Sequence, residues 1–350
     1  MSRALFEARS RLAVFALFLL SACGSGEPYR QESFVFGTRV EVAVQGVERG
    51  RAREAIGSVL REFDRLHRML HAWQPSELTR LNDAIGRGER SIPVPDELAR
   101  ILAHAAGIAQ TSDHLFEPAI GRLVRLWGFH GETFEPRLPP AADIAAVLRA
   151  RPRMSDLTIA QGRVESRNRQ VMIDLGGYAK GYALDRAAVI LRQQGITNAL
   201  INIGGNVMAL GTKAGKPWRV GIQNPRAAGT FASLDLFDGE AIGTSGDYQR
   251  FFELGGRRYS HLIDPRSGAP AQGVQAVTVL VGPGEAAGAL SDAASKPLFI
   301  AAEGEWRALA HRLGVERALR IDASGKITLT RALARRVHFG AGNPAVEIVE

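Results

Sequence analysis

Apolar residues recur along the chain with two periods, and each period predicts a different kind of element. Between residues 34 and 44 apolar and polar residues alternate, which is typical of a strand. From 51 to 70 the apolar residues follow helical spacing, at Ala52, Ala55, Ile56, Val59, Phe63, Leu66 and Leu70. A second helix is expected to start at Asp96, an N-cap type of residue, and to run to Ala109. A loop with proline and serine at 73–76 separates the two helices.

From residue 157 onward short β-type runs dominate, and helices interrupt them only occasionally. The predicted strands are 171–175, 199–203, 218–222, 259–263 and 274–281. The predicted helices are 179–194, 286–301 and 305–313, and a Pro-rich piece at 135–142 is the best internal linker. Strands that recur as neighbours argue against a uniform doubly wound sheet. The predicted fold class is therefore α+β, a mixed sheet core with packed helices in a single large domain.

The first 22 residues have the order of a bacterial signal peptide. An apolar stretch at 12–20, too short to span a bilayer, follows basic residues at Arg3, Arg9 and Arg11. The sequence Leu20-Ser21-Ala22-Cys23 then resembles a lipobox, in which small residues precede a cysteine that receives diacylglycerol. We therefore predict a lipoprotein signal peptide at 1–22. The alternative is an ordinary signal peptide followed by an accidental cysteine.

A lipid on Cys23 would anchor the chain to a bacterial membrane, facing the periplasm. Residues 23–33 begin with small and polar residues and are expected to form a flexible tether, and the folded domain is expected at 34–350. Gly24, in place of an aspartate after the cysteine, favours the outer membrane over the inner one, and both stay open. Because Cys23 is the only cysteine, no thiol is left for disulfides, metal clusters or nucleophilic catalysis.

The net charge is basic without indicating a nucleic-acid partner. The formal charge of +8 falls to +6 when the signal peptide, with three arginines and one glutamate, is removed. Basic surfaces attract anions in general. The arginines are scattered among acidic residues, however, and no basic run with interleaved aromatic residues is present. The charge therefore predicts a mildly cationic, solvated surface.

The densest group of candidate functional residues lies at 174–185, where a strand is expected to pass through two glycines into a helix. Such a turn exposes backbone N–H groups at a helix start, and Lys180 adds a cation, so an anion such as a phosphate is favoured there. Asp174 lies at the strand end, where its carboxylate could accept from a ring nitrogen or a hydroxyl. The alternative is a tight strand-to-helix connection that Asp174 caps.

Two later segments carry further candidate chemistry. In 259–268 a strand end places His261 beside an Asp-Pro turn, where a histidine either serves as a base or is structural. In the small-residue helix at 291–296, Asp292 would let a metal or a phosphate approach closely, or would form a surface pair at i, i+4 with Lys296. Taken singly, two glycine-containing segments predict only turns, 202–206 and 244–248.

In this order the blocks resemble one family, the FAD:protein FMN transferases of the ApbE type, flavin-transferring lipoproteins once assigned to thiamine biosynthesis. The resemblance covers nearly the whole mature chain and includes two more blocks, 76–82 and 123–129. It implies a catalytic domain at 34–350 that moves the FMN half of FAD onto a threonine hydroxyl, releases AMP and uses Mg²⁺. It also implies FAD as donor substrate and, as acceptor partners, flavoproteins of periplasm-facing respiratory complexes.

The resemblance further implies a role for individual residues. His261 matches the general base, and Asp292 is the second residue expected to be catalytic. The expected contacts with FAD are Phe36, Trp73, Phe116, Glu117, Pro118, Asp174, Lys180 and Ile263. The expected metal ligands are the carbonyl of Gly177 together with Asp292, Ser295 and Lys296.

Two positions depart from the family pattern. The family commonly has Phe-Asp-x-Thr where this chain has Phe116-Glu117-Pro118-Ala119, a change that would reshape how the flavin is held. Lys296 stands where a threonine or alanine usually completes the metal site, so its ammonium would either take the metal's place or pair with Asp292. Two rival functions stay open: an FAD pyrophosphatase with water as nucleophile, and a non-catalytic flavin-binding lipoprotein.

Overall fold

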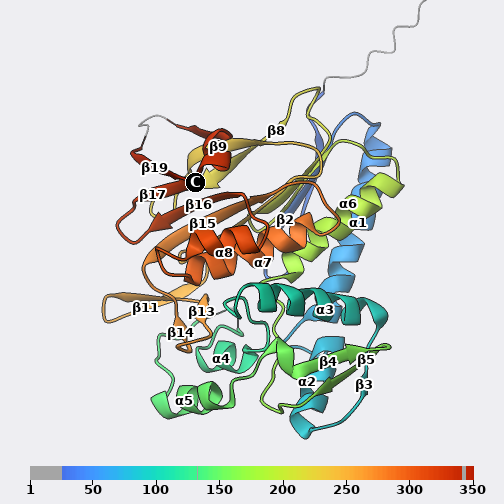
Figure 1. Ribbon diagram of the computed structural model, residues 1–350. Helices are drawn as coiled ribbons and strands as arrows, with labels where there is room; N and C mark the ends of the chain where they lie inside the picture. The colour runs from blue at the N-terminus through green and yellow to red at the C-terminus, as the bar shows by residue number, and fades with distance from the viewer. Residues whose placement is uncertain (1–25, 132, 341–343) are drawn as a thin grey trace, which may run out of the picture.

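The computed structural model describes residues 26–131, 133–340 and 344–350, which form a mixed α and β structure (Figure 1). The predicted signal peptide at 1–22 and the predicted lipid-bearing Cys23 lie outside the described residues. Within the described ranges, no helix is both long enough and apolar enough to cross a membrane.

A large mixed sheet forms the centre of the fold. Its nine strands in the described ranges lie in the order β1-β2-β6-β7-β10-β15-β16-β17-β19. All neighbours pair antiparallel except β17 and β19, which are parallel. The strands are β1 (Tyr29–Val35), β2 (Thr38–Val44), β6 (Ala199–Ile203), β7 (Asn206–Leu210), β10 (Ala241–Gly246), β15 (Val274–Val281), β16 (Arg317–Asp322), β17 (Ile327–Thr330) and β19 (Val346–Val349). The predicted α+β class with a mixed sheet is confirmed.

Helices cover one face of this sheet and a smaller sheet covers the other. On the helical face α1 (Arg49–Leu70), α6 (Ala179–Gln193) and α7 (Ala287–Ile300) pack on the strands, and α8 (Trp306–Arg312) packs on α7 (Figure 1). The opposite face buries a second apolar cluster under three strands: β8 (Trp218–Gln223), β9 (Thr230–Leu236) and β18 (Val337–Phe339). A short helix, α9 (Arg331–Ala334), precedes β18.

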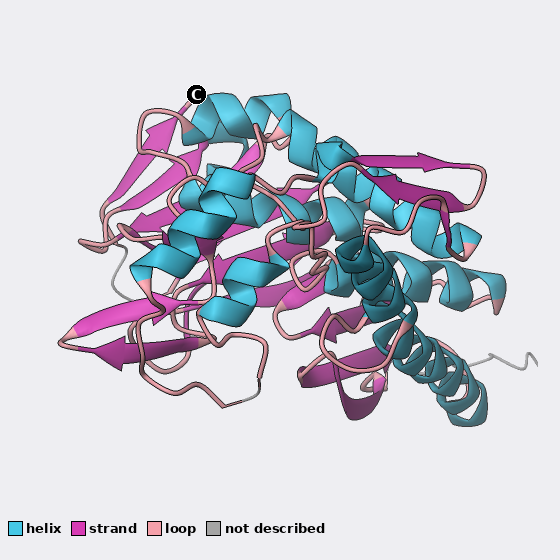
Figure 2. Cartoon of the chain, turned by 90° about the horizontal axis from the view of Figure 1, so that it is seen from below, coloured by secondary structure: helices cyan, strands magenta, loops and turns pink. Residues whose placement is uncertain are grey.

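A smaller region of helices and short strands lies below the helical layer in Figure 1. Its elements are α2 (Glu77–Arg87), β3 (Ile92–Pro93), α3 (Asp96–Thr111), α4 (Gly121–Leu126), α5 (Ala141–Ala150), the 3₁₀ helix η1 (Met154–Asp156), β4 (Leu157–Ala160) and β5 (Arg163–Ser166). Two hairpins complete the described structure: β11 (Phe251–Leu254) with β12 (Arg257–Ser260), and β13 (Ile263–Asp264) with β14 (Ala269–Pro270). Seen from below, helices stand in front of the strands of the main sheet (Figure 2).

Three predicted strands differ in the structure. The single strand expected at 34–44 is a hairpin, because Phe36 and Gly37 both adopt positive φ and turn the chain in two residues. Its first strand starts at Tyr29, so the tether predicted at 23–33 overlaps the folded body. The segment 171–175 is only bridged, at Met172 to Ile120, and the strand expected at 259–263 breaks at His261.

Glycines allow α7 to lie very close to its neighbours. A Cβ on Gly181 of α6 would stand 2.2 Å from the carbonyl oxygen of Gly288 in α7, and one on Gly288 would stand 2.3 Å from that of Gly181. On the other side, a Cβ on Gly243 of β10 would lie 2.3 Å from the carbonyl oxygen of Ser291. Since only glycine permits these approaches, the start of α6 and the middle of α7 are held side by side.

Candidate active site

A cleft of about 680 Å³ collects most of the residues expected to form the site. It is lined by segments from the β1–β2 turn, the loop after α1, the loop before α4, the start of α6, the β12–β13 break and α7. The predicted residues on its wall are Phe36, Trp73, Phe116, Glu117, Pro118, Asp174, Gly177, Lys180, His261, Ile263 and Lys296. Asp292 and Ser295 are buried behind this wall. The chain thus brings eleven predicted residues together on one surface.

Asp174 and the glycine turn are fixed in place by a buried amide. Asn82 of α2 donates to the carbonyl of Ile173 at 2.9 Å and accepts from the N–H of Ile173 at 2.7 Å. Asp174 Oδ1 then accepts from the N–H of Gly176 at 2.7 Å, which shapes the turn into α6. Burial raises the pKa of Asp174, against the lowering effect of that hydrogen bond. Asp174 thus stabilises the turn, whereas α6 has no side-chain cap and its N-cap residue is Tyr178.

Lys180 lies at the start of α6 and reaches back over the turn. Its Nζ donates to the carbonyl of Gly176 at 3.0 Å. Its ammonium is thus placed beside a helix N-terminus, where free backbone N–H groups already favour anions. This end of the cleft can receive a phosphate group.

The segment 116–118 lines the cleft, but the carboxylate of Glu117 serves the protein itself. It bonds to His114 Nδ1 at 2.6 Å and accepts from the N–H groups of Met154 at 2.8 Å and Ala119 at 3.1 Å. Every strong contact of this carboxylate is therefore internal. If Glu117 contacts FAD as predicted, it does so through its backbone, because its side chain stabilises the loop.

Aromatic side chains form the other end of the cleft. Phe36 lies at the β1–β2 turn with φ +57°, a conformation that is unfavourable for a residue with a Cβ. Its ring is held against Phe63 and His67 of α1, with centroids 6.3 and 5.6 Å away. Trp73 packs on His130 at 5.6 Å and lies under the guanidinium of Arg125. Rings at this end suit a flat aromatic ligand.

The imidazole of His261 is held in its neutral form, with the proton on one nitrogen and a lone pair on the other. Its Nδ1 lies 3.2 Å from the carbonyl oxygen of Arg250, and its backbone N–H donates to the same oxygen at 3.0 Å. Because a carbonyl only accepts, Nδ1 carries the proton and Nε2 keeps its lone pair. Burial, with the charges of Arg250, Lys180 and Lys296, lowers the pKa of His261 to about 3. The imidazole is therefore neutral at physiological pH.

Asp292 and Lys296 form an ion pair behind the cleft wall. The Nζ of Lys296 contacts Asp292 Oδ1 and also donates to the carbonyl of Asp292 at 2.8 Å. Burial alone would raise the pKa of Asp292, but the charges of Lys180 and Lys296 and the hydrogen bonds from Lys296 and Gly181 lower it to about 2. Burial lowers the pKa of Lys296 to about 8, although Asp292 favours its charged form. Asp292 and Lys296 thus form a pair, but the carboxylate is fully buried and not at the surface as the alternative expected.

The predicted metal ligands do not fit a divalent cation in this arrangement. Mg²⁺ prefers several oxygen ligands in an octahedron, and Asp292 is the only carboxylate of the set. The hydroxyl of Ser295 is already engaged, with the carbonyl of Asp292 at 2.8 Å and with Ser245 at 2.7 Å. In the described part of the chain, no three His, Cys, Asp or Glu side chains are grouped as a metal site. The Mg²⁺ ligand set stays a prediction that these contacts do not favour.

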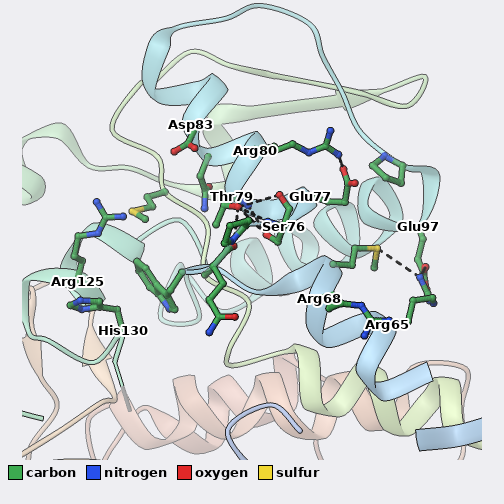
Figure 3. A pocket seen from close by; sticks show the side chains of 18 residues that line it. Arg65, Arg68, Ser76, Glu77, Thr79, Arg80, Asp83, Glu97, Arg125 and His130 are labelled. Atoms are coloured by element: carbon green, nitrogen blue, oxygen red, sulfur yellow. Dashed lines mark hydrogen bonds and ion pairs between the residues drawn. The ribbon is translucent and has the colours of Figure 1, made fainter. Parts of the chain in front are cut away.

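A second cavity, of about 970 Å³, adjoins the cleft at Trp73. Figure 3 shows Arg125 and His130 at one end of it and Arg65, Arg68 and Glu97 at the other. Much of its charge is compensated, since Glu97 pairs with Arg65 and Glu77 pairs with Arg80. At its centre Ser76 caps α2 by accepting from the N–H of Thr79 at 2.9 Å. Trp73 is therefore part of the wall of both the cleft and this mixed-charge cavity.

Sequence reasoning missed several residues of the cleft. Arg250 brings a third cation and bonds to the carbonyls of Phe129 and Gly131 at 2.9 Å each. Asn82 positions the Asp174 turn. His71, Thr244, Ser245 and Gln249 also line the cleft. The glycine-containing segment 244–248 could have indicated this part of the site, because it ends two residues before Arg250.

Together the fold and the site suit an enzyme or binding protein for an anionic small molecule with an aromatic part, because cations and a helix start line one end of the cleft and aromatic rings the other. Comparison with known proteins is more specific. The sequence profile of the ApbE family matches residues 36–319, and the chain belongs to this family.

Relatives and solved structures extend over most of the chain. A Rhodobacter capsulatus protein named FAD:protein FMN transferase is 42% identical over 309 residues, covering 88% of this chain and 58% of that protein. A Klebsiella pneumoniae protein of the same name is 34% identical over 242 residues, covering 67% of this chain and 68% of that protein. This chain thus spans less than two thirds of the first relative.

The fold matches experimental structures of the family. The crystal structure of the ApbE protein from Thermotoga maritima superposes with a TM-score of 0.80 at 30% identity, covering 89% of this chain and 99% of that one. The apo flavinyl transferase ApbE from Pseudomonas stutzeri gives a TM-score of 0.75 at 30% identity, covering 90% and 98%.

Proposed function

We propose that this chain transfers the FMN half of FAD onto a threonine hydroxyl of a target protein and releases AMP. The family supports this reaction, as do the names of its relatives. The single observation in the structure that carries it is the neutral His261, whose Nε2 keeps a lone pair in a cleft lined by cations. A base of this kind is what a hydroxyl nucleophile needs.

The reaction exchanges one phosphorus–oxygen bond for another. The threonine oxygen bonds to the phosphorus of the FMN half, and the bond from that phosphorus to the bridging oxygen breaks. The electron pair of the broken bond leaves with AMP, and the hydroxyl proton passes to His261 Nε2. A positioned base of this kind contributes on the order of a hundred- to ten-thousand-fold in rate.

The cations of the cleft neutralise the charge that the pyrophosphate brings and that AMP carries away. Lys180, Arg250 and Lys296 lie close enough to His261 for their charges to lower its pKa, so they surround the same point. Such preorganised charges stabilise a transition state more strongly than they would in water. The proposed reaction contains no step through a metal, because the expected ligands do not fit one.

We further propose that the protein acts at a membrane surface. The order of residues before Cys23 supports a diacylglyceryl anchor there. Two acyl chains are sufficient for stable anchoring, whereas one is not. The acceptors would then be flavoproteins of respiratory complexes that face the periplasm. The anchor itself would lie in either the inner or the outer membrane.

AMP release with and without an acceptor tests the proposal. Flavin transfer predicts AMP only when a hydroxyl-bearing acceptor protein is present, in equal amount to the flavin bound to it. An FAD pyrophosphatase would release AMP and free FMN at a rate that the acceptor does not change. A flavin-binding lipoprotein would release no AMP. Either of these two results would contradict the proposed transferase activity.

A further inference from the structure

The carboxylate of Asp292 is completely buried and has both oxygens engaged by donors of this chain. Oδ1 contacts the ammonium of Lys296. Oδ2 accepts from the N–H of Gly181 at 3.0 Å and lies 3.9 Å from Nζ of Lys180. The side chain of Asp292 is 0% exposed, against 15% for Lys296 and 25% for Lys180. The two ammonium groups therefore lie between this carboxylate and the cleft.

Lys296 runs past Gly177 and ends on Asp292, two of the residues predicted to bind the metal. A Cβ built on Gly177 would lie 3.3 Å from Cε of Lys296, so the lysine chain passes directly beside Gly177. At its tip the ammonium contacts Asp292 Oδ1 and the carbonyl of Asp292. A cation that binds Oδ1 of Asp292 would have to displace this ammonium first.

The net charge around Asp292 also disfavours a divalent cation. One carboxylate already faces two ammonium groups, which leaves the cluster of Asp292, Lys180 and Lys296 with one net positive charge. A divalent cation would add two further positive charges to this cluster. Buried charges without partners are strongly unfavourable.

We infer that the Lys296 ammonium is a built-in replacement for a divalent cation in this chain. The Lys296 ammonium is held by Asp292 beside the ammonium of Lys180, and it binds the oxygens of the pyrophosphate and of the leaving phosphate. This inference rests on the proposed transfer reaction for its catalytic part. An ammonium supplies three N–H donors and one charge, and Lys180 adds a second positive charge on the other oxygen of Asp292.

Metal binding by the purified protein tests the inference without any need for activity. Mn²⁺ is added to metal-stripped protein without FAD, and its free spin-resonance signal is followed. The wild type should leave the signal unchanged, whereas Lys296→Thr should bind one Mn²⁺ beside Asp292. Tight binding by the wild type, or none by Lys296→Thr, would overturn the inference. Because the first outcome needs no variant, misfolding of Lys296→Thr does not remove the test.

Activity in a chelator tests the catalytic part. Wild-type transfer should continue at full rate in EDTA, while Lys296→Thr should lose roughly a hundredfold or more and regain rate with Mg²⁺. The matched control, Lys326→Thr, removes an exposed lysine paired with Glu347 and should behave as the wild type. Wild-type transfer that stops in EDTA and returns with Mg²⁺ would contradict the inference. If no protein transfers flavin, the proposed reaction fails and the Mn²⁺ titration still decides the role of Lys296.

Discussion

His261 is the residue on which the proposed chemistry depends, and its role differs from that of the residues that bind FAD. His261→Ala should bind FAD almost normally but lose about a hundred- to ten-thousand-fold in the transfer rate. Asp174→Ala or Lys180→Ala should instead weaken FAD binding, because these side chains shape and charge the turn at α6. Calorimetric titration with FAD and the rate of acceptor flavinylation separate the two effects. Unchanged transfer by His261→Ala would remove it from the reaction.

The environment of His261 also predicts the pH dependence. Its pKa of about 3 in the free protein keeps Nε2 unprotonated throughout the physiological range, so kcat/KM for FAD should show no acid limb between pH 8 and 5. Bound pyrophosphate brings negative charge that favours the protonated imidazole, so any acid limb in kcat should appear at higher pH. A fall of kcat/KM centred near pH 6.5 would contradict the assignment. His261→Ala should lack the limb in kcat.

At the scale of the elements, close packing of α6 on α7 is expected to matter for both stability and activity. Gly288→Ala would place a Cβ 2.3 Å from the carbonyl of Gly181, which should destabilise the protein by roughly 1–3 kcal/mol and slow transfer by moving Lys296. Gly107→Ala in α3 is the matched control, because nothing lies within 4 Å of its Cβ. It should stabilise by about 0.5–1 kcal/mol. Urea unfolding measures both, and equal effects would contradict the packing argument.

The hydrophobic pattern predicted helices and strands correctly where one period continued over many residues. It missed them where the chain makes a tight turn or where a strand is interrupted. The helix expected at 51–70 is α1, Arg49–Leu70, and the one at 286–301 is α7, Ala287–Ile300. The turn at Phe36 and Gly37 was missed because a phenylalanine seldom adopts positive φ and one glycine did not break the alternating pattern. The segment 171–175 is mostly apolar but forms a single β-bridge, at Met172, since Asn82 takes the backbone groups of Ile173.

On the scale of the whole molecule, the site combines residues from distant parts of the chain, and the family resemblance predicted most of them. The resemblance placed Phe36, Trp73 and His261 in one site, and the structure brings them to one cleft. It did not predict where side chains point. The carboxylate of Glu117 turns inward to His114 because its donors are there, a fact that depends on tertiary packing. Arg250 was missed for the same reason.

The attachment of the molecule to a membrane is a separate prediction. Cys23→Ser removes the predicted acceptor of diacylglycerol and should move the protein from the membrane pellet to the soluble periplasmic fraction. Cell fractionation followed by immunoblotting measures the distribution. Retention of Cys23→Ser in the pellet would place the anchor elsewhere, and the folded domain should transfer flavin equally well in either case.

The most direct test of the proposed function is the intact mass of an acceptor protein after incubation with this protein and FAD. Transfer predicts a mass increase equal to one FMN residue, located by fragmentation on a single threonine, together with one AMP for each acceptor modified. His261→Ala should leave the acceptor mass unchanged over the same time. An unmodified acceptor in the presence of the wild-type protein, with FAD either intact or cleaved to free FMN, would contradict the account.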